Sequence, residues 1–184
     1  MLRTRIFNDY CRNKDLRNRE EEVRMELLEN SKDVELLREL GAILYYSKRD
    51  DEAIIIYEKL LKLDGENHNF MAFLGYLHYE LENHSEAINY FNMALDVAPD
   101  SPFIYFLLGN AYSRHGNIID AIRSYDFAIF LDLDIYTAHL DFAKKYEDMG
   151  RKKRALKEYI TAYEIDPRDK EIEFKINKLK QETA

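Results

Sequence analysis

Residues 72–99 read AFLGYLHYELENHSEAINYFNMALDVAP, and the spacing within this stretch recurs along the chain. Four kinds of position each recur every 34 residues. They are a small residue after leucine or phenylalanine, an alanine, an aromatic residue, and a second small or aliphatic residue. The four series are Gly41, Gly75, Gly109 and Ala143; Ala53, Ala87, Ala121 and Ala155; Tyr57, Phe91, Tyr125 and Tyr159; and Leu60, Ala94, Ala128 and Ala162. A period of this length indicates a repeat architecture.

Each repeat is predicted to hold two helices. In the second helix the alanine, the ring and the small residue recur at i, i+4 and i+7, which is one face of a helix. Small residues let the two backbones approach, and the ring fills the space beside them. Asn83 with Glu86 is similar to a capping box, and Pro102 after Ser101 is typical of a helix start. The predicted pairs span about 33–47 and 50–63, 67–81 and 84–97, 101–115 and 118–131, and 135–149 and 152–165.

At these positions the sequence resembles the tetratricopeptide repeat (TPR) family over residues 34–167. The family pattern is met by Leu74-Gly75, Ala87, Phe91, Ala94 and Pro99, and again by Tyr105, Leu108-Gly109, Tyr112, Ala121, Tyr125 and Ala128. Departures are mild: the chain has no tryptophan, and Ala143 replaces glycine. The resemblance implies an all-α fold, a right-handed superhelical α-solenoid of helix-turn-helix repeats.

The expected domain organisation is four repeats between two caps. Residues Lys170–Lys180 suggest a final amphipathic helix that covers the open end of the solenoid. The predicted parts are a basic leader with an amino-terminal capping helix (1–33), repeats 1 to 4 (34–67, 68–101, 102–135 and 136–169) and a carboxy-terminal capping helix (170–184).

The composition of the chain limits the classes of function that it can have. The formal net charge is −8, so the chain lacks the basic surface that nucleic-acid binding needs. Residues 1–19 are the exception, with six basic groups against two acidic ones. The single cysteine, Cys11, excludes an internal disulfide and fits a reducing compartment. No apolar run approaches the roughly 20 residues that span a bilayer. We therefore expect a cytoplasmic protein without membrane or nucleic-acid contacts.

The resemblance also implies where a ligand would bind, because in this family the other side of the first helices lines the concave groove. The predicted partner-binding residues on that side are Tyr45, Tyr46, Phe73, Tyr76, Tyr79, Phe103, Phe106, Asn110, Arg114 and Lys144. Exposed apolar surface marks interaction sites, and aromatic residues and arginine are frequent anchors. The alternative is that neighbouring first helices bury these rings against each other. The sequence leaves both interpretations open.

The function expected from this resemblance is protein–protein interaction, as an adaptor or scaffold that binds a protein or peptide with apolar or aromatic anchors. The carboxylate clamp known in some members is broken, since Phe106 replaces its lysine and Asp141 an asparagine. Three acidic residues near one end, Asp141, Glu147 and Asp148, could pair with a basic stretch of the ligand. The alternative is that they form a solvated charged face. The alternative function is a self-assembling structural or regulatory scaffold that acts through the basic leader, the ends or the convex face.

Sequence motifs for catalysis are lacking. The glycines are isolated at repeat positions, so no phosphate-cradling loop is present. The five histidines form no i, i+4 pair, and His78 and His139 fall on packing positions. Cys11 has no evident base partner. We expect no catalytic residue, metal or cofactor, and hence no enzyme.

Overall fold

The computed structural model describes residues 16–183, and all regular secondary structure in that range is α-helical. The expected all-helical fold is therefore confirmed for these residues. The helices are α2 (Leu16–Glu29), α3 (Val34–Tyr46), α4 (Asp50–Leu63), α5 (His68–Glu80), α6 (His84–Val97), α7 (Pro102–His115), α8 (Ile118–Phe130), α9 (Ile135–Asp148), α10 (Lys152–Ile165) and α11 (Lys170–Thr183). Residues 1–15 of the predicted leader, with Cys11, lie outside the described range.

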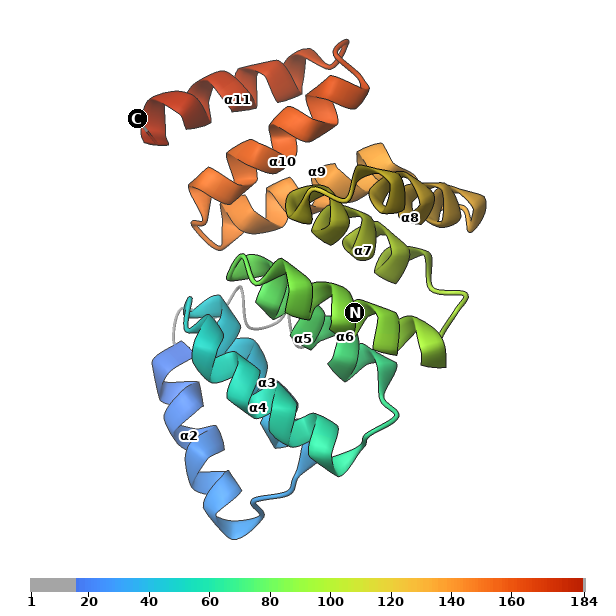
Figure 1. The fold of residues 1–184 in the computed structure, drawn as a ribbon. Helices are drawn as coiled ribbons and strands as arrows, with labels where there is room; N and C mark the ends of the chain where they lie inside the picture. The colour runs from blue at the N-terminus through green and yellow to red at the C-terminus, as the bar shows by residue number, and fades with distance from the viewer. Residues whose placement is uncertain (1–15, 184) are drawn as a thin grey trace. The chain divides into compact units, whose positions relative to one another are not determined.

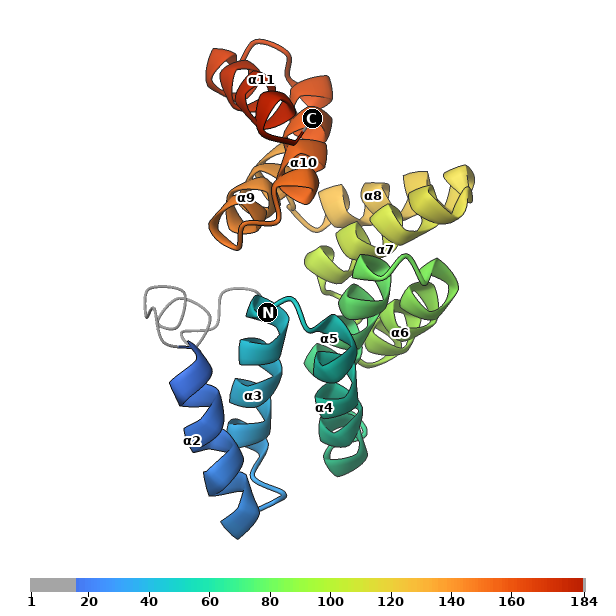
Figure 2. The same ribbon diagram turned by 90° about the vertical axis from the view of Figure 1, so that its left-hand side faces the viewer.

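The chain forms two compact units that divide between Leu131 and Asp132. In the first unit each helix from α2 to α7 packs against the next one in the chain, and Figures 1 and 2 show α2, α3 and α4 side by side. In the second unit α9 packs on α10, and α10 packs on α11. Such sequential packing is the arrangement of a helical solenoid within each unit. No helix in residues 16–183 is long and apolar enough to cross a membrane.

Each helix pair in the first unit closes over a glycine. A Cβ atom built on Gly75 would lie 2.8 Å from two carbon atoms of the Phe91 ring. A Cβ atom built on Gly41 or Gly109 would lie similarly close to the tyrosine ring of its own pair, at 2.6 Å and 2.7 Å. Phe91 is fully buried as a result. The 34-residue spacing of small and aromatic residues thus has a direct cause, since the ring occupies the volume of the missing side chain.

Helix starts follow the expected chemistry only in part. Asp33 and Asn67 cap α3 and α5, because their side-chain oxygens accept hydrogen bonds from two backbone N–H groups each. Pro102 begins α7, as predicted. Asn83 occupies the N-cap of α6, but its side chain makes no capping hydrogen bond. The predicted capping box of Asn83 and Glu86 is therefore wrong.

The turn inside each helix pair contains one residue with a left-handed backbone. These residues also recur every 34 positions: Lys48 (φ 62°), Glu82 (φ 63°), Gly116 (φ 91°) and Gly150 (φ 64°). Glycine adopts this conformation without the clash that a Cβ atom causes. The first two repeats therefore hold a strained residue where the last two hold glycine.

We expect Glu82→Gly to stabilise the first unit by about 1 kcal/mol, because glycine relieves the left-handed strain at that turn. Urea unfolding followed by circular dichroism measures the change. Glu82→Ala is the matched control, since alanine keeps the Cβ atom and should bring no gain. Equal gains in stability for Glu82→Gly and Glu82→Ala would contradict the prediction. They would show that the glutamate side chain, and not the left-handed backbone, destabilises the turn.

The first and last helices of the described range, α2 and α11, keep the repeat register. Both ends of α2 precede those of α4 by 34 residues, so α2 has the repeat position of a second helix. It holds Arg19 and Val23 at the positions of Ala53 and Tyr57. Val23 is fully buried, and Arg19 donates two hydrogen bonds to the Glu39 carboxylate, at 2.6 and 2.9 Å. Both ends of α11 follow those of α7 by 68 residues, which gives α11 the repeat position of a first helix.

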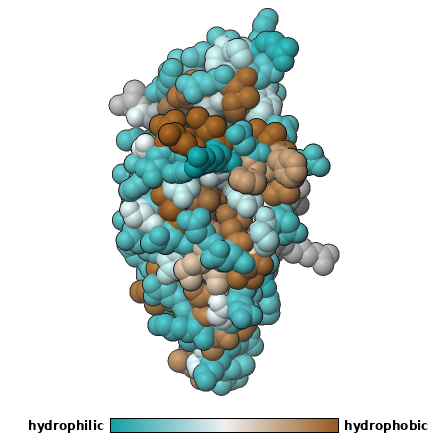
Figure 3. All heavy atoms as spheres, turned by 45° about the vertical axis from the view of Figure 1, so that its right-hand side comes forward, coloured by the Kyte–Doolittle hydropathy of each residue, from teal (hydrophilic) through white to brown (hydrophobic). Residues whose placement is uncertain are grey.

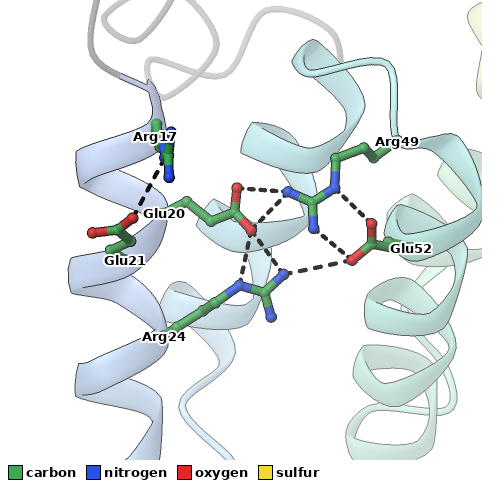
Figure 4. A network of polar contacts seen from close by, with 6 residues as sticks. All are labelled: Arg17, Glu20, Glu21, Arg24, Arg49 and Glu52. Atoms are coloured by element: carbon green, nitrogen blue, oxygen red, sulfur yellow. Dashed lines mark hydrogen bonds and ion pairs between the residues drawn. The ribbon is translucent and has the colours of Figure 1, made fainter.

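A network of ion pairs ties α2 to the α3–α4 turn (Figure 4). Arg49 donates through Nη1 to both oxygens of Glu20, at 2.8 and 2.7 Å, and through Nε and Nη2 to Glu52, at 2.6 Å each. Arg24 donates to the same Glu20 at 2.8 Å. The hydrogen bonds from Arg49 hold the pKa of Glu52 below its ordinary value. Charged contacts thus join α2 to the α3–α4 turn beside the buried Val23.

Candidate partner-binding surface

Three of the predicted groove rings are packed together inside the first unit. Tyr45 is 0% exposed, Phe73 2% and Tyr76 1%. Their ring centroids lie 5.6 to 5.9 Å apart, and the Phe73 ring lies 4.3 Å from that of Tyr57. The hydroxyl groups of Tyr45 and Tyr76 share a 2.7 Å hydrogen bond, which satisfies both groups in the interior. Burial raises the pKa of Tyr57.

The remaining predicted residues differ in exposure. Phe106 is fully buried, and its ring lies 6.1 Å from that of Phe103 and 6.4 Å from that of Tyr125. Asn110 is half-buried and accepts a 2.7 Å hydrogen bond from the Tyr125 hydroxyl. Tyr46, Tyr79 and Phe103 are half-buried, while Arg114 and Lys144 are exposed. A ligand can therefore reach six of the ten residues, and the four buried rings hold the first helices in place.

Three of the accessible residues lie at the carboxy-terminal ends of the first helices of successive repeats. Tyr46 is the last residue of α3, Tyr79 the penultimate residue of α5 and Arg114 the penultimate residue of α7. Tyr46 and Arg114 are separated by 68 residues and so occupy the same repeat position two repeats apart. Tyr79 lies one residue before the corresponding position in α5. The carboxy-terminal ends of α3, α5 and α7 thus carry two rings and one guanidinium group.

Lys144 belongs to α9 in the second unit, whereas the other nine predicted residues belong to the first. The acidic side chains near it are not equivalent. Glu147 is half-buried and accepts hydrogen bonds from Tyr159 and Lys175, at 2.9 Å each. Burial opposes its charge, but the hydrogen bonds from Lys175 and Tyr159 keep its pKa below the ordinary value. Glu147 is therefore engaged within its own unit, while Asp141 and Asp148 are exposed.

Histidines expected at packing positions are found there. His139 is 5% exposed, and its Nδ1 atom lies 2.7 Å from Oε2 of Glu158. His78 is half-buried, and its ring stacks on Tyr90 at a centroid distance of 5.4 Å. Burial lowers the pKa of His78. Within residues 16–183 no group of three or more histidine, cysteine, aspartate or glutamate side chains is placed to hold a metal ion.

One surface was not predicted from the sequence. Six large apolar residues of α8 are exposed: Ile118, Ile119, Ile122, Phe127, Ile129 and Phe130. The repeat signature assigned the second helices to the core, which is correct for the opposite side of α8, where Ala121, Ser124 and Ala128 are buried. The sequence feature that could have indicated this surface is the presence of four isoleucines within residues 118–129.

Sequential helix pairs in which a ring covers a small residue define the chain as a helical-repeat protein. Residues 75–116 match the family described as TPR repeat, and residues 35–67 and 136–169 match that described as tetratricopeptide repeat. These segments make up more than half of the chain. The chain belongs to the tetratricopeptide repeat family.

Solved structures show the same fold. A tetratricopeptide repeat protein from Parabacteroides merdae superposes with a TM-score of 0.67 at 21% identity, covering 94% of this chain and 68% of that one. MamA from Desulfovibrio magneticus gives a TM-score of 0.65 at 18% identity, covering 86% of this chain and 90% of that one. At these identities the likeness concerns the fold alone.

Curated relatives are much longer proteins. The anaphase-promoting complex subunit CDC16 of Saccharomyces cerevisiae is 28% identical over 135 residues, which is 73% of this chain. The chain spans 16% of that protein's length. The similarity therefore concerns one segment of the relative.

Proposed function

We propose that the chain is a protein-binding module, an adaptor or scaffold without catalytic function, and that its partner contacts the carboxy-terminal ends of α3, α5 and α7. The observation that carries the proposal is the placement of Tyr46, Tyr79 and Arg114 at one end of successive first helices, accessible to solvent. Tyrosine and arginine are enriched among the residues that dominate binding energy. The yeast relative is named as a subunit of a protein complex, which agrees with an interaction role.

The buried ring cluster supports this role because it fixes the helices that present the surface. Tyr45, Phe73 and Tyr76 contact one another and a ring of the neighbouring α4. A ligand then binds without the loss of conformational entropy that ordering these helices would cause, and preorganisation of this kind raises affinity. The partner segment would place apolar side chains against the tyrosines and an acceptor group, such as a carboxylate, against Arg114.

A variant with Tyr46→Ala, Tyr79→Ala and Arg114→Ala should lose the partner while it stays folded with the helix content of wild type. Each anchor of this kind contributes about 1–2 kcal/mol or more, so we expect at least a tenfold loss of affinity. Partners are captured from native lysate and identified by quantitative mass spectrometry. The dissociation constant is then measured with purified components.

The matched control replaces exposed residues of the second helices, with Ile55→Ala and Met93→Ala. Wild type and control should capture the same partner equally well. A partner that the folded triple variant retains at full affinity would refute the proposed surface. A partner lost by the control but kept by the triple variant would move the site to the second helices.

A further inference from the structure

Residues 1–15 are attached to the first unit beside the candidate partner-binding surface. α2 and α3 lie side by side and are joined by a short connection, residues 30–33, so they run antiparallel (Figure 2). Arg49, three residues beyond the end of α3, donates hydrogen bonds of 2.8 and 2.7 Å to Glu20, in the second turn of α2. The start of α2 therefore lies near Tyr46, the last residue of α3.

This segment is long enough to reach the neighbouring first helix. Ring contacts of Tyr45 with Phe73 and Tyr76 make α5 the neighbour of α3. Packed helices lie about 8–10 Å apart, and an extended chain advances about 3.3–3.6 Å per residue. About three residues therefore cross from α3 to α5, and the segment is several times longer than that.

The composition of the segment combines cations with large apolar side chains. Its charged residues are four cations and two acids: Arg3, Arg5, Arg12 and Lys14, with Asp9 and Asp15. Its large apolar residues are Leu2, Ile6, Phe7 and Tyr10. We therefore expect it to bind where aromatic rings lie beside negative charge.

The carboxy-terminal ends of α3 and α5 provide both features. Tyr46 and Tyr79 are half-buried rings at these ends. Glu80, the last residue of α5, is 6% exposed, and a carboxylate at this depth needs a cation or a hydrogen-bond donor beside it. The ends of helices also carry a partial negative charge from their last carbonyl groups, which favours cations.

Exposed apolar side chains occur at several places on the chain, as Figure 3 shows for one face. Exposure alone therefore does not select a docking site. The ends of α3 and α5 differ from those places because rings, a carboxylate and the attachment point of a basic, apolar segment lie together there.

We propose that residues 1–15 bind in cis across the carboxy-terminal ends of α3 and α5. The rings of the segment pack on Tyr46 and Tyr79, and its arginines approach Glu80. A short tether gives an effective concentration of about millimolar, which favours this binding over binding to a second copy. The bound segment covers two of the three residues proposed above to contact a partner, so a partner must displace it. That consequence rests on the proposed function, whereas the docking itself does not.

Photo-cross-linking of the full chain tests the docking. Cys11 is the only cysteine, so a benzophenone maleimide attaches within the segment and nowhere else. Mass spectrometry identifies the cross-linked peptides. We expect most cross-links at residues 42–49 and 76–83, around the ends of α3 and α5. Mixing isotope-labelled and unlabelled chains separates cross-links within one chain from those between two.

Charge reversal in the segment should weaken the docking. Arg3→Glu with Arg5→Glu should lower the yield of these cross-links at least about fivefold, because charge-assisted contacts become repulsive. Lys59→Glu with Lys62→Glu is the matched control, since both lysines are exposed on α4 and the net charge changes by the same amount. This control should leave the yield unchanged.

Removal of the two rings tests the other half of the contact. Tyr46→Ala with Tyr79→Ala should also lower the yield at least about fivefold, since each ring is an anchor of the kind that dominates binding energy. Circular dichroism verifies that this variant is folded. The charge-reversed variant leaves the described helices unaltered, so it tests the proposal even where the tyrosine variant loses stability.

Four results would overturn the proposal. These are cross-links spread without preference over the second helices, a yield unaffected by Arg3→Glu with Arg5→Glu, a yield unaffected by Tyr46→Ala with Tyr79→Ala, and cross-links that join labelled to unlabelled chains. The last result would make the segment a link between two copies. Because the free chain is used, failure here leaves the function proposed above standing. Conversely, a partner retained by the triple variant would refute that function and leave the cross-links unexplained by it and intact.

Discussion

Replacing Phe91 by alanine is expected to lower the free energy of unfolding of the first unit by about 3–5 kcal/mol, the usual cost of removing a buried phenylalanine ring. Phe91 is 0% exposed, and its ring lies over Gly75, so its loss leaves a cavity between α5 and α6. Urea denaturation followed by far-ultraviolet circular dichroism measures the change.

Phe130→Ala is the matched control for this substitution, because the same side chain is 81% exposed at the end of α8. Surface substitutions of this kind usually change stability by less than about 0.5 kcal/mol. Similar losses for Phe91→Ala and Phe130→Ala would contradict the packing described for α5 and α6. Loss of helix content in Phe91→Ala even without urea would agree with it.

The second large effect is expected at Gly75. On an open helix surface, alanine would gain about 1 kcal/mol over glycine through helix propensity. At Gly75, however, the new Cβ atom would lie 2.8 Å from the Phe91 ring and 3.1 Å from the carbonyl oxygen of Ala87. Overpacking of this kind costs about 1–3 kcal/mol. Because the backbone of α6 must shift, we expect Gly75→Ala to destabilise the first unit.

Ala143 provides a natural comparison, since it occupies the same repeat position in α9 and is fully buried. Ala143→Gly should lose about 1 kcal/mol through helix propensity and a further amount because a buried methyl group is removed. The same urea titration distinguishes the two cases. A gain of stability in Gly75→Ala would mean that α5 and α6 are further apart than the structure shows.

The sequence predicted the repeat fold well because its packing depends on few residue types at fixed spacing. The Phe91 ring fits only beside a residue without a side chain at position 75, so a small residue and an aromatic residue recur together along the chain. This pairing indicates the helix pairs. The capping helices lack this pattern. Arg19 stands in α2 where Ala53 stands in α4, and an ion pair to Glu39 replaces apolar contact there. The sequence therefore predicted a capping helix but not its place in the repeat register.

The candidate surface was less accessible to sequence reasoning. Helical spacing shows which side of α3 and α5 a residue occupies, and this was enough to group Tyr45, Phe73 and Tyr76 with Tyr46 and Tyr79. Whether a ring on that side is exposed depends on neighbours from other helices, which spacing does not reveal. The structure buries the first three and leaves the last two accessible. The packing interpretation therefore holds for the first three rings, and binding at the last two stays a prediction.

Hydrogen exchange of the chain bound to its captured partner tests the proposed function most directly. We expect slower exchange at the carboxy-terminal turns of α3, α5 and α7, around Tyr46, Tyr79 and Arg114, with little change in α4 and α6. Protection confined to α4 and α6, with exchange around the three residues as fast as in the unbound chain, would contradict the proposed surface.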